Sequence, residues 1–384
     1  MADAAVGGAA HVLVAVDKFK GSLTAAQVAR RVTAGLRRAA PGIPVQALPV
    51  ADGGDGTVEA AVAAGFERRE VRVTGPLGGP VTAAFALRGD TAIVEMAEAS
   101  GLRLLPEGVR APLTATTRGF GELLRAALDA GARTLVLGVG GSATTDGGAG
   151  MLTALGARFL DAEGRPVGPG GGGLRALAAA DLSRLDPRLA DVELVLAGDV
   201  DNPLTGPEGA PAVFGPQKGA TRDDVRALEA ALVRYVEVLA GAVGPRAAEA
   251  AVAPGAGGGG GTGYGALVGL GAVFRPGIDL MLDVLGFPEA LGRATLVITG
   301  EGSLDEQTLR GKAPAGVAAA ARAAGVDTVA VCGRLALSPQ ALARTGIRRA
   351  YPLTDLEPDP AVCMAQAGPL VERAAAAVAR DFLA

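Results

Sequence analysis

Carboxylates, lysines and glycine-lined backbone are the groups through which this sequence could do chemistry. Only one of the 384 residues is a histidine, His11. It starts an apolar run, whereas ligands of α/β proteins bind beyond the other ends of the strands. Histidine bases, histidine-bound metals and Ser–His–Asp triads are therefore not expected. Phosphoryl transfer needs little else than these groups, because positioned charges and backbone dipoles supply most of its catalysis.

The first candidate site is the loop that follows the apolar run Thr134–Val139. Glycine, serine, threonine and one aspartate crowd together there, and small side chains let a ligand come close to the backbone. Backbone N–H groups at the end of a buried strand bind anions such as phosphate. The residues expected to bind the phosphates of a nucleotide are Gly140, Gly141, Ser142, Thr144, Thr145, Asp146, Gly147 and Gly148.

Two polar loops near the N-terminus form a second candidate site. One follows the run His11–Val16 and the other follows Val45–Val50, and each precedes a predicted helix. A helix N-terminus with lysines nearby favours an anion. A solvated turn or a simple helix cap would use the same residue types, so these readings stay open. The residues expected to bind substrate are Asp17, Lys20, Ser22, Asp52, Gly53 and Gly54.

A third group of polar residues follows the run Val192–Ala197. Asp199 and Asp201 come directly after it, and Lys218 lies a short distance further on. Two carboxylates and an ammonium group are more than a turn requires, although an Asx turn before Pro203 would also explain the acids.

The elements that would position these loops predict an α/β fold of two dissimilar domains. At both ends of the chain, apolar runs alternate with helical patterns, which is typical of a parallel sheet of the Rossmann or flavodoxin-like kind. The runs Glu70–Thr74, Val81–Leu87 and Thr91–Met96 follow one another without a helix and indicate a mixed sheet. We expect the active site to lie in the cleft between the two domains. The expected domains are residues 1–70 together with 288–384, and an inserted domain of residues 71–287.

Several local features are expected around the loops. Ser22 is predicted to cap a helix over Thr24–Ala39, and Met151–Phe159 is predicted to be helical. The glycine-rich residues 164–174 are expected to form a mobile surface loop. Residues 254–265 contain matches to GxGxxG simply because glycine is dense there, and a flexible connection is an equally open interpretation.

Composition narrows the class of protein. The net charge is −4, which gives no reason to expect nucleic acid as a partner. Cys332 and Cys363 lack the spacing of a zinc site or a disulfide framework. No apolar run reaches the roughly 18 residues that cross a bilayer, and residues 1–10 lack the features of a signal peptide. We therefore expect a cytoplasmic protein with no membrane partner.

Three ligand classes fit the glycine-rich loops to different degrees. Residues 138–143 match the dinucleotide pattern GxGxxA, and Asp161 follows at about the right distance for a nicotinamide enzyme. The helix does not start where that pattern requires, however. A P-loop is rejected, because Gly311-Lys312 has Glu306 in place of the first glycine. A kinase of another fold and a non-enzymatic binder of small ligands remain.

A family resemblance decides among these classes. The motifs that carry it are DKFKGS (17–22), PVADGGDGT (49–57), VTGPLGGPV (73–81), GVGGSATTDGGAGM (138–151), GDVDNPLTGPEGA (198–210), VFGPQKGA (213–220) and TGEGSLDEQTLRGKAP (299–314). In this order they resemble the type I bacterial glycerate kinase family, from about residue 11 to the C-terminus.

The resemblance implies phosphorylation of D-glycerate by ATP with Mg²⁺, usually at the 2-hydroxyl to give 2-phosphoglycerate. It also implies two dissimilar α/β domains. A 3-phosphoglycerate product, the stereochemical preference and a homo-oligomer stay open. The sequence departs from the commoner family pattern at a few positions, which are Lys18, Thr145, Ser303 and Glu306.

Chemical roles follow as hypotheses once glycerate is the expected substrate. Its carboxylate would bind Lys20, since an ammonium and a helix N-terminus both favour an anion. Asp199 is the first choice for the general base and Asp201 the second. Asp201 and Asp52 are the expected ligands of Mg²⁺. Lys218 would neutralise charge on the transferred phosphoryl group.

Overall fold

The structure is a computed structural model that describes residues 11–383. Within them the chain forms two compact units. Unit 1 comprises the residues up to Asp52, the short piece Glu59–Ala64 and everything from Ile278 onward, and unit 2 comprises Gly53–Val58 and Gly65–Gly277. The domain boundaries expected from the sequence stay a prediction, because compactness alone does not show that a part folds independently.

Unit 1 is built on a parallel sheet of five strands. Its order is β15-β13-β11-β1-β2, and every neighbouring pair is parallel. Numbered along the unit, this is the 2-1-3-4-5 order of flavodoxin-like folds, which confirms the predicted class of sheet. The strands are β1 His11–Val16, β2 Val45–Ala47, β11 Ala294–Gly300, β13 Thr328–Cys332 and β15 Ile347–Pro352, with a separate pair of short strands, β12 Ser303–Leu304 and β14 Arg334–Leu335.

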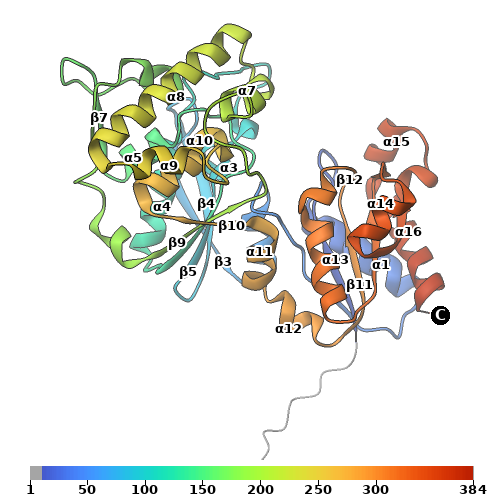
Figure 1. The fold of residues 1–384 in the computed structure, drawn as a ribbon. Helices are drawn as coiled ribbons and strands as arrows, with labels where there is room; N and C mark the ends of the chain where they lie inside the picture. The colour runs from blue at the N-terminus through green and yellow to red at the C-terminus, as the bar shows by residue number, and fades with distance from the viewer. Residues whose placement is uncertain (1–10, 384) are drawn as a thin grey trace, which may run out of the picture. The chain divides into compact units, whose positions relative to one another are not determined.

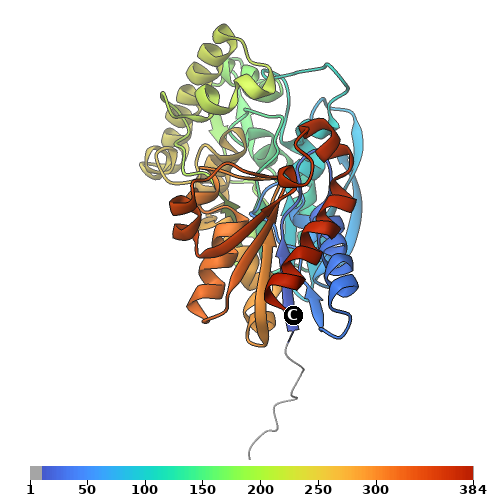
Figure 2. The same cartoon turned by 90° about the vertical axis from the view of Figure 1, so that its right-hand side faces the viewer.

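Helices cover both faces of this sheet. On one face α1 and α16 lie side by side, blue and red in Figures 1 and 2. A Cβ at Gly35 of α1 would lie only 2.3 Å from the carbonyl oxygen of Glu372 in α16, so the two backbones pack very closely. A second apolar cluster lies around α13 and α14. The helices of this unit are α1 Ala25–Ala39, α11 Gly277–Leu285, α12 Phe287–Leu291, α13 Ala313–Ala323, α14 Pro339–Thr345, α15 Pro360–Ala365 and α16 Ala367–Phe382, and α2 Thr57–Ala63 begins in unit 2.

The start of α1 corrects one expectation. Thr24, not Ser22, caps the helix: its hydroxyl accepts the N–H of Gln27, and the Gln27 side chain accepts the N–H of Thr24. This reciprocal pair satisfies two N–H groups, which a lone serine two residues earlier cannot do. The Ser22 hydroxyl instead donates to the carbonyl of Phe19.

Unit 2 contains a mixed sheet of six strands, as expected. The order is β10-β9-β6-β5-β4-β3. The pairs from β10 to β5 are parallel, and β5, β4 and β3 form an antiparallel meander. The strands are β3 Glu67–Thr74, β4 Pro80–Arg88, β5 Thr91–Glu95, β6 Thr134–Gly138, β9 Glu193–Gly198 and β10 Val273–Pro276, with a separate hairpin-like pair, β7 Arg158–Leu160 and β8 Ala179–Asp181.

The helices of unit 2 pack around one large apolar core. The aromatic rings in that core are few, and Tyr235 of α8 contacts both Phe159 and Tyr264 edge to face. Figure 1 shows α8 and α9 beside one another above the sheet. The helices are α3 Met96–Ser100, α4 Arg118–Asp129, α5 Ala149–Ala154, α6 Gly170–Gly173, α7 Ala210–Phe214, α8 Arg222–Val243, α9 Arg246–Ala251 and α10 Gly258–Gly265.

Two predictions in this unit were wrong. The helix expected over Met151–Phe159 ends at Ala154, and β7 begins at Arg158. Gly156 lies between them at a φ of +117°, and a Cβ there would come within 2.1 Å of a backbone oxygen. The turn therefore requires glycine, and glycine in this left-handed region cannot continue a helix.

The glycine-rich residues 254–265 are not a flexible connection. They contain α10, in which Gly259, Gly260 and Gly261 have positive φ angles. Nearly all of these residues are buried. Residues 164–174 also include a packed part, since a Cβ at Gly171 would lie 2.1 Å from the carbonyl oxygen of Thr145.

Candidate active site

The carboxyl edge of the parallel sheet in unit 1 carries two buried acids. Asp17 follows β1 directly and Glu301 follows β11 directly. These strands are adjacent, and the N–H of Asp17 donates to the carbonyl of Gly300 at 2.8 Å. The gap between β1 and β11 is the place where the strand order reverses, and ligands of such sheets bind there. Unit 1 therefore has acids where its topology predicts a ligand site.

The pKa values of both acids are raised above those of free carboxyl groups. Burial raises the pKa of Asp17 to about 6, against the lowering effect of Lys18, and the negative charge of Asp52 adds to the rise. Burial likewise raises the pKa of Glu301 to about 7, although the Thr308 hydroxyl donates to it at 2.6 Å. Carboxyl groups that titrate near neutrality are typical of functional sites.

Lysines lie beside these acids. The Nζ atom of Lys18 is 3.4 Å from Asp17, and that of Lys312 is 4.0 Å from Glu301. Lys20 is exposed, and the loop that bears it packs near Gly302, since a Cβ there would be 3.3 Å from the Lys20 nitrogen. Of the predicted substrate-binding residues, unit 1 thus contains Asp17, Lys20, Ser22 and Asp52.

Gly53 and Gly54, the other two predicted substrate ligands, belong to unit 2. They lie on the carboxyl edge of the mixed sheet, in backbone contact with the loop after β6. A Cβ at Gly140 would be 2.5 Å from the Cα of Gly54, and a Cβ at Gly138 would be 2.7 Å from the Gly53 oxygen. Only glycine permits this approach. Two glycine-rich loops predicted to bind different ligands are therefore packed directly together.

The second half of the predicted phosphate-binding loop is buried. Thr144, Thr145 and Asp146 have no exposed surface, and the two threonine hydroxyls have no hydrogen-bond partner. The Asp146 carboxylate accepts the N–H groups of Thr117, Gly148 and Gly150 and also the Thr117 hydroxyl. Contact of these three residues with a phosphate stays a prediction, and Asp146 has a structural role that the sequence did not reveal.

Lys218 is buried beneath the same loop. Its Nζ atom donates to the Ser142 hydroxyl at 2.9 Å and to the Thr144 carbonyl at 2.6 Å. Burial lowers the pKa of this ammonium group to about 7, and the charge of Asp146 opposes the change. Lys218 thus holds the loop in the structure, whereas its expected contact with a phosphoryl group stays a prediction.

The glycines of α10 complete the support of this loop. The N–H of Gly147 donates to the Gly260 carbonyl at 3.2 Å. A Cβ at Gly260 would lie 1.9 Å from the Thr144 oxygen and 2.9 Å from the Lys218 Nζ atom. The density of glycine in residues 254–265 therefore serves close packing against the loop.

Asp199 and Asp201 lie at the same edge of unit 2, after β9. Both are exposed, and β9 is the parallel neighbour of β6. A Cβ at Gly53 would lie 3.0 Å from the Ala197 oxygen, so the 53–54 loop also contacts the end of β9. The structure thus brings Asp199 to the sheet edge that carries Gly53, Gly54, Gly140 and Gly141. The two expected Mg²⁺ ligands, Asp52 and Asp201, fall in different units.

Two buried acids at strand ends escaped the sequence analysis. They are Glu301 after β11 and Glu95 at the end of β5, which is 1% exposed. Both occupy the position that identified Asp17, namely the first acid at the carboxyl end of an apolar strand. Applying that rule to every strand would have found them.

Comparison with known proteins gives one consistent result. A family model described as "Glycerate kinase family" matches residues 12–383. A protein named glycerate kinase from Halalkalibacterium halodurans is 45% identical over 371 residues, 96% of this chain and 97% of the relative. A protein named glycerate 2-kinase from Escherichia coli K12 is 45% identical over 328 residues, 84% of this chain and 85% of the relative.

A solved structure supports the same assignment. A protein described as glycerate kinase 2 from Salmonella typhimurium LT2 aligns with a TM-score of 0.84 at 42% identity, covering 98% of this chain and 99% of that one. The two proteins therefore share the same α/β fold. This chain belongs to the glycerate kinase family.

Proposed function

We propose that this protein phosphorylates D-glycerate with ATP and forms 2-phosphoglycerate. The observation that supports it most is the family match over residues 12–383, together with a relative named glycerate 2-kinase at 45% identity. The residue types at both sheet edges suit the reaction, because phosphoryl transfer depends on positioning and charge.

The acids and lysines of unit 1 suit glycerate. Its carboxylate would pair with the exposed ammonium group of Lys20, and its hydroxyls would donate to Asp17 and Glu301. Both acids lie at the strand-order reversal. A carboxylate accepts a hydroxyl hydrogen bond without needing to be reoriented, so these acids would fix the position of the substrate.

The loop after β6 in unit 2 suits the phosphates of ATP. Gly140, Gly141 and Ser142 form its first half, and Lys218 fixes that half from below through the Ser142 hydroxyl. Backbone N–H groups held in place in this way bind anions without reorganisation. Asp199 remains the proposed general base, because it is exposed at the same edge of the sheet and a carboxylate can accept the proton of a reacting hydroxyl.

A divalent cation would accompany the nucleotide. Among residues 11–383 no group of three or more acids, cysteines or histidine could hold a metal by itself. This fits Mg²⁺, which is usually held by one or two carboxylates together with phosphate oxygens. Asp52 and Asp201 are the proposed carboxylates, and the cation would neutralise phosphate charge when bound.

A cytoplasmic location is proposed with the same function, since both substrates are small metabolites. No helix within residues 11–383 combines the length and apolar character that crossing a membrane demands.

The test is ³¹P NMR of the product made from ATP and D-glycerate. We expect consumption of ATP in proportion to added glycerate and a doublet from phosphate on the carbon-2 hydroxyl. A triplet from phosphate on carbon 3 would instead identify 3-phosphoglycerate. Absence of any phosphorylated glycerate, with NAD(P)⁺ reduction by hydroxy acids, would favour a dehydrogenase and overturn the proposal.

A further inference from the structure

The segment Gly53–Val58 is an unusual part of the chain. It belongs to unit 2, although the residues before it, up to Asp52, and after it, Glu59–Ala64, belong to unit 1. Gly53 and Gly56 have φ angles of +86° and +95°, and the Thr57 hydroxyl donates to the Gly54 carbonyl at 2.5 Å. Six residues with few side chains of their own must therefore be held on unit 2 by contacts from elsewhere in that unit.

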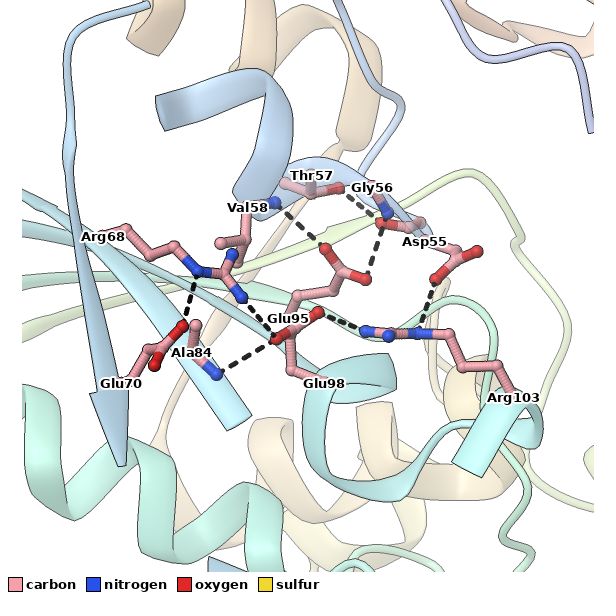
Figure 3. Close-up of polar contacts among 11 residues, drawn as sticks. Asp55, Gly56, Thr57, Val58, Arg68, Glu70, Ala84, Glu95, Glu98 and Arg103 are labelled. Carbon is pink, nitrogen blue, oxygen red and sulfur yellow. Dashed lines mark hydrogen bonds and ion pairs between the residues drawn. The ribbon is translucent and has the colours of Figure 1, made fainter. Parts of the chain in front are cut away.

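Glu95 supplies the strongest of these contacts (Figure 3). One of its carboxylate oxygens accepts the N–H of Gly56 at 3.1 Å, and the other accepts the N–H of Val58 at 3.0 Å. The carboxylate lies at the end of β5 and is 1% exposed, so these bonds are shielded from water. Burial raises the pKa of Glu95 to about 7, against the lowering effect of the N–H groups of Val58 and Gly56. When the group is ionised, it accepts both N–H groups as charge-assisted hydrogen bonds, which are worth more than neutral ones.

A second layer of charged groups surrounds this anchor. Asp55, inside the segment, lies 3.4 Å from Arg103, and Arg103 also pairs with Glu98. Glu98 accepts the N–H of Ala84 at 3.1 Å and therefore is fixed to β4. Figure 3 shows this chain of contacts on the side of Glu95 away from Val58. Asp55 and Arg103 are about half exposed, and such pairs contribute little on their own.

The backbone contacts of Gly53–Val58 connect Glu95 with the candidate active site. Gly53 and Gly54 pack on Ala197, Gly138 and Gly140 through backbone atoms. A shift of the segment would thus move the backbone against the first half of the phosphate-binding loop and the end of β9. Rigid placement of such groups matters because small displacements cost much of the rate.

We propose that Glu95 is a positioning residue for the phosphoryl transfer: its carboxylate fixes Gly53–Val58 on the sheet edge and thereby sets the geometry of Gly53 and Gly54 toward glycerate. The inference rests on the proposed function, and its structural half is testable without it.

The experiment compares Glu95→Gln with Glu122→Gln. In Glu95→Gln the new amide would present its NH₂ group to one of the two N–H donors, so at least one bond is lost. Glu122 is the matched control, because it also accepts a backbone N–H, that of Thr74, at 2.7 Å, but has no contact with the segment. Hydrogen–deuterium exchange is measured on peptides covering residues 50–64 and, as a reference, β6. Steady-state kinetics are measured with ATP and glycerate.

We expect Glu95→Gln to speed exchange in Gly53–Val58 by about tenfold or more while β6 is unchanged, and to raise the KM for glycerate by about tenfold, the size of one charge-assisted bond. The KM for ATP should rise less, by about threefold, because Gly54 contacts Gly140 of the loop expected to bind the phosphates but is not itself expected to bind ATP. Glu122→Gln should match the wild type. If Glu95→Gln does not fold, Glu95→Asp is used, which keeps the carboxylate on a side chain one methylene shorter. It should increase the exchange rate of Gly53–Val58 and the KM for glycerate by less.

Two results would overturn the inference. Unchanged exchange in Gly53–Val58 means that Glu95 does not fix the segment. Faster exchange with unchanged kinetics means that the fixed segment does not serve the reaction. A wild-type protein that does not phosphorylate glycerate would contradict the proposed function instead, and the exchange result would still decide the structural half.

Discussion

The buried acids of the two units have different partners. In unit 1, Glu301 accepts the Thr308 hydroxyl and lies near the Lys312 ammonium group, and Asp17 accepts the N–H of the next residue, Lys18. In unit 2, Glu95 and Asp146 accept backbone N–H groups from segments distant in sequence. A side-chain partner can rotate away when a ligand arrives, whereas a backbone partner is fixed by the fold. The difference indicates that Glu301 in unit 1 is available to substrate and that Glu95 and Asp146 in unit 2 hold loops.

The largest effect is expected at Asp199, which is exposed and so differs from the buried acids of unit 2. Asp199→Asn should lower kcat by about 10²–10⁴, the usual contribution of a general base. Binding of ATP, followed by equilibrium titration, should be retained. Glu208→Gln, an exposed acid in the same loop, is the control and should leave kcat unchanged. Near-normal kcat in Asp199→Asn would remove Asp199 from the mechanism.

Asp146 tests the structural side of the comparison. Asp146→Ala leaves three backbone N–H groups and the Thr117 hydroxyl without their acceptor inside the protein. We expect the free energy of unfolding to fall by about 3–5 kcal/mol, as when a buried hydrogen-bonded group loses its partner. Urea denaturation measures the free energy of unfolding. The control is Asp223→Ala, a change at an exposed residue, which should lower it by less than about 0.5 kcal/mol. Equal stability of both variants would contradict the loop-holding role.

Glu301 tests the other half of the comparison, namely that this acid is available to substrate. Glu301→Gln should raise the KM for glycerate by about tenfold, since a neutral amide is a weaker acceptor for the substrate hydroxyl. Its free energy of unfolding should change by less than about 1 kcal/mol, because the Glu301 carboxylate accepts the Thr308 hydroxyl, which an amide oxygen can also accept. Glu306→Gln lies in the same loop and is exposed, so it should behave as wild type. A large loss of stability with unchanged KM would place Glu301 with the structural acids.

Lys218 gives the most specific pH dependence. Burial lowers its pKa from 10.5 to about 7. Between these values the unfolded chain holds more protons than the folded one, so the free energy of unfolding rises with pH, by at most about 1.4 kcal/mol per pH unit. Lys218→Met should lack this rise. Urea denaturation of both proteins at about pH 7.5 and about pH 9 measures the difference, and parallel behaviour would show that Lys218 stays protonated in the folded protein.

The sequence predicted the strands and the loops after them because valine-rich runs that end in glycine and aspartate have few alternative readings. It predicted the two kinds of sheet for the same reason. It failed where one residue type serves opposite purposes. Glycine in residues 254–265 could indicate a flexible backbone or close packing. The contact of Gly260 with the Thr144 oxygen, which the sequence does not reveal, shows close packing.

The site could be predicted as a set of loops but not as a set of contacts. Lys218 is a charged residue that an isolated sequence places at the surface, yet its interior position depends on the Ser142 hydroxyl and the Thr144 carbonyl, which are more than 70 residues away in the chain. The position of Glu95 at a strand end could have been predicted, but its contacts could not, because the N–H groups it accepts come from a different part of the sequence.

The position of Gly53–Val58 has a consequence for dissecting this protein. A fragment of residues 65–277 would include most of unit 2, but it would lack the two N–H groups that the Glu95 carboxylate accepts. Such a fragment should be less stable than unit 2 of the whole chain, and a synthetic peptide of residues 50–64 supplied in trans should stabilise it. The interior of unit 2 is thus completed by six of its own residues that precede the rest of that unit in the chain.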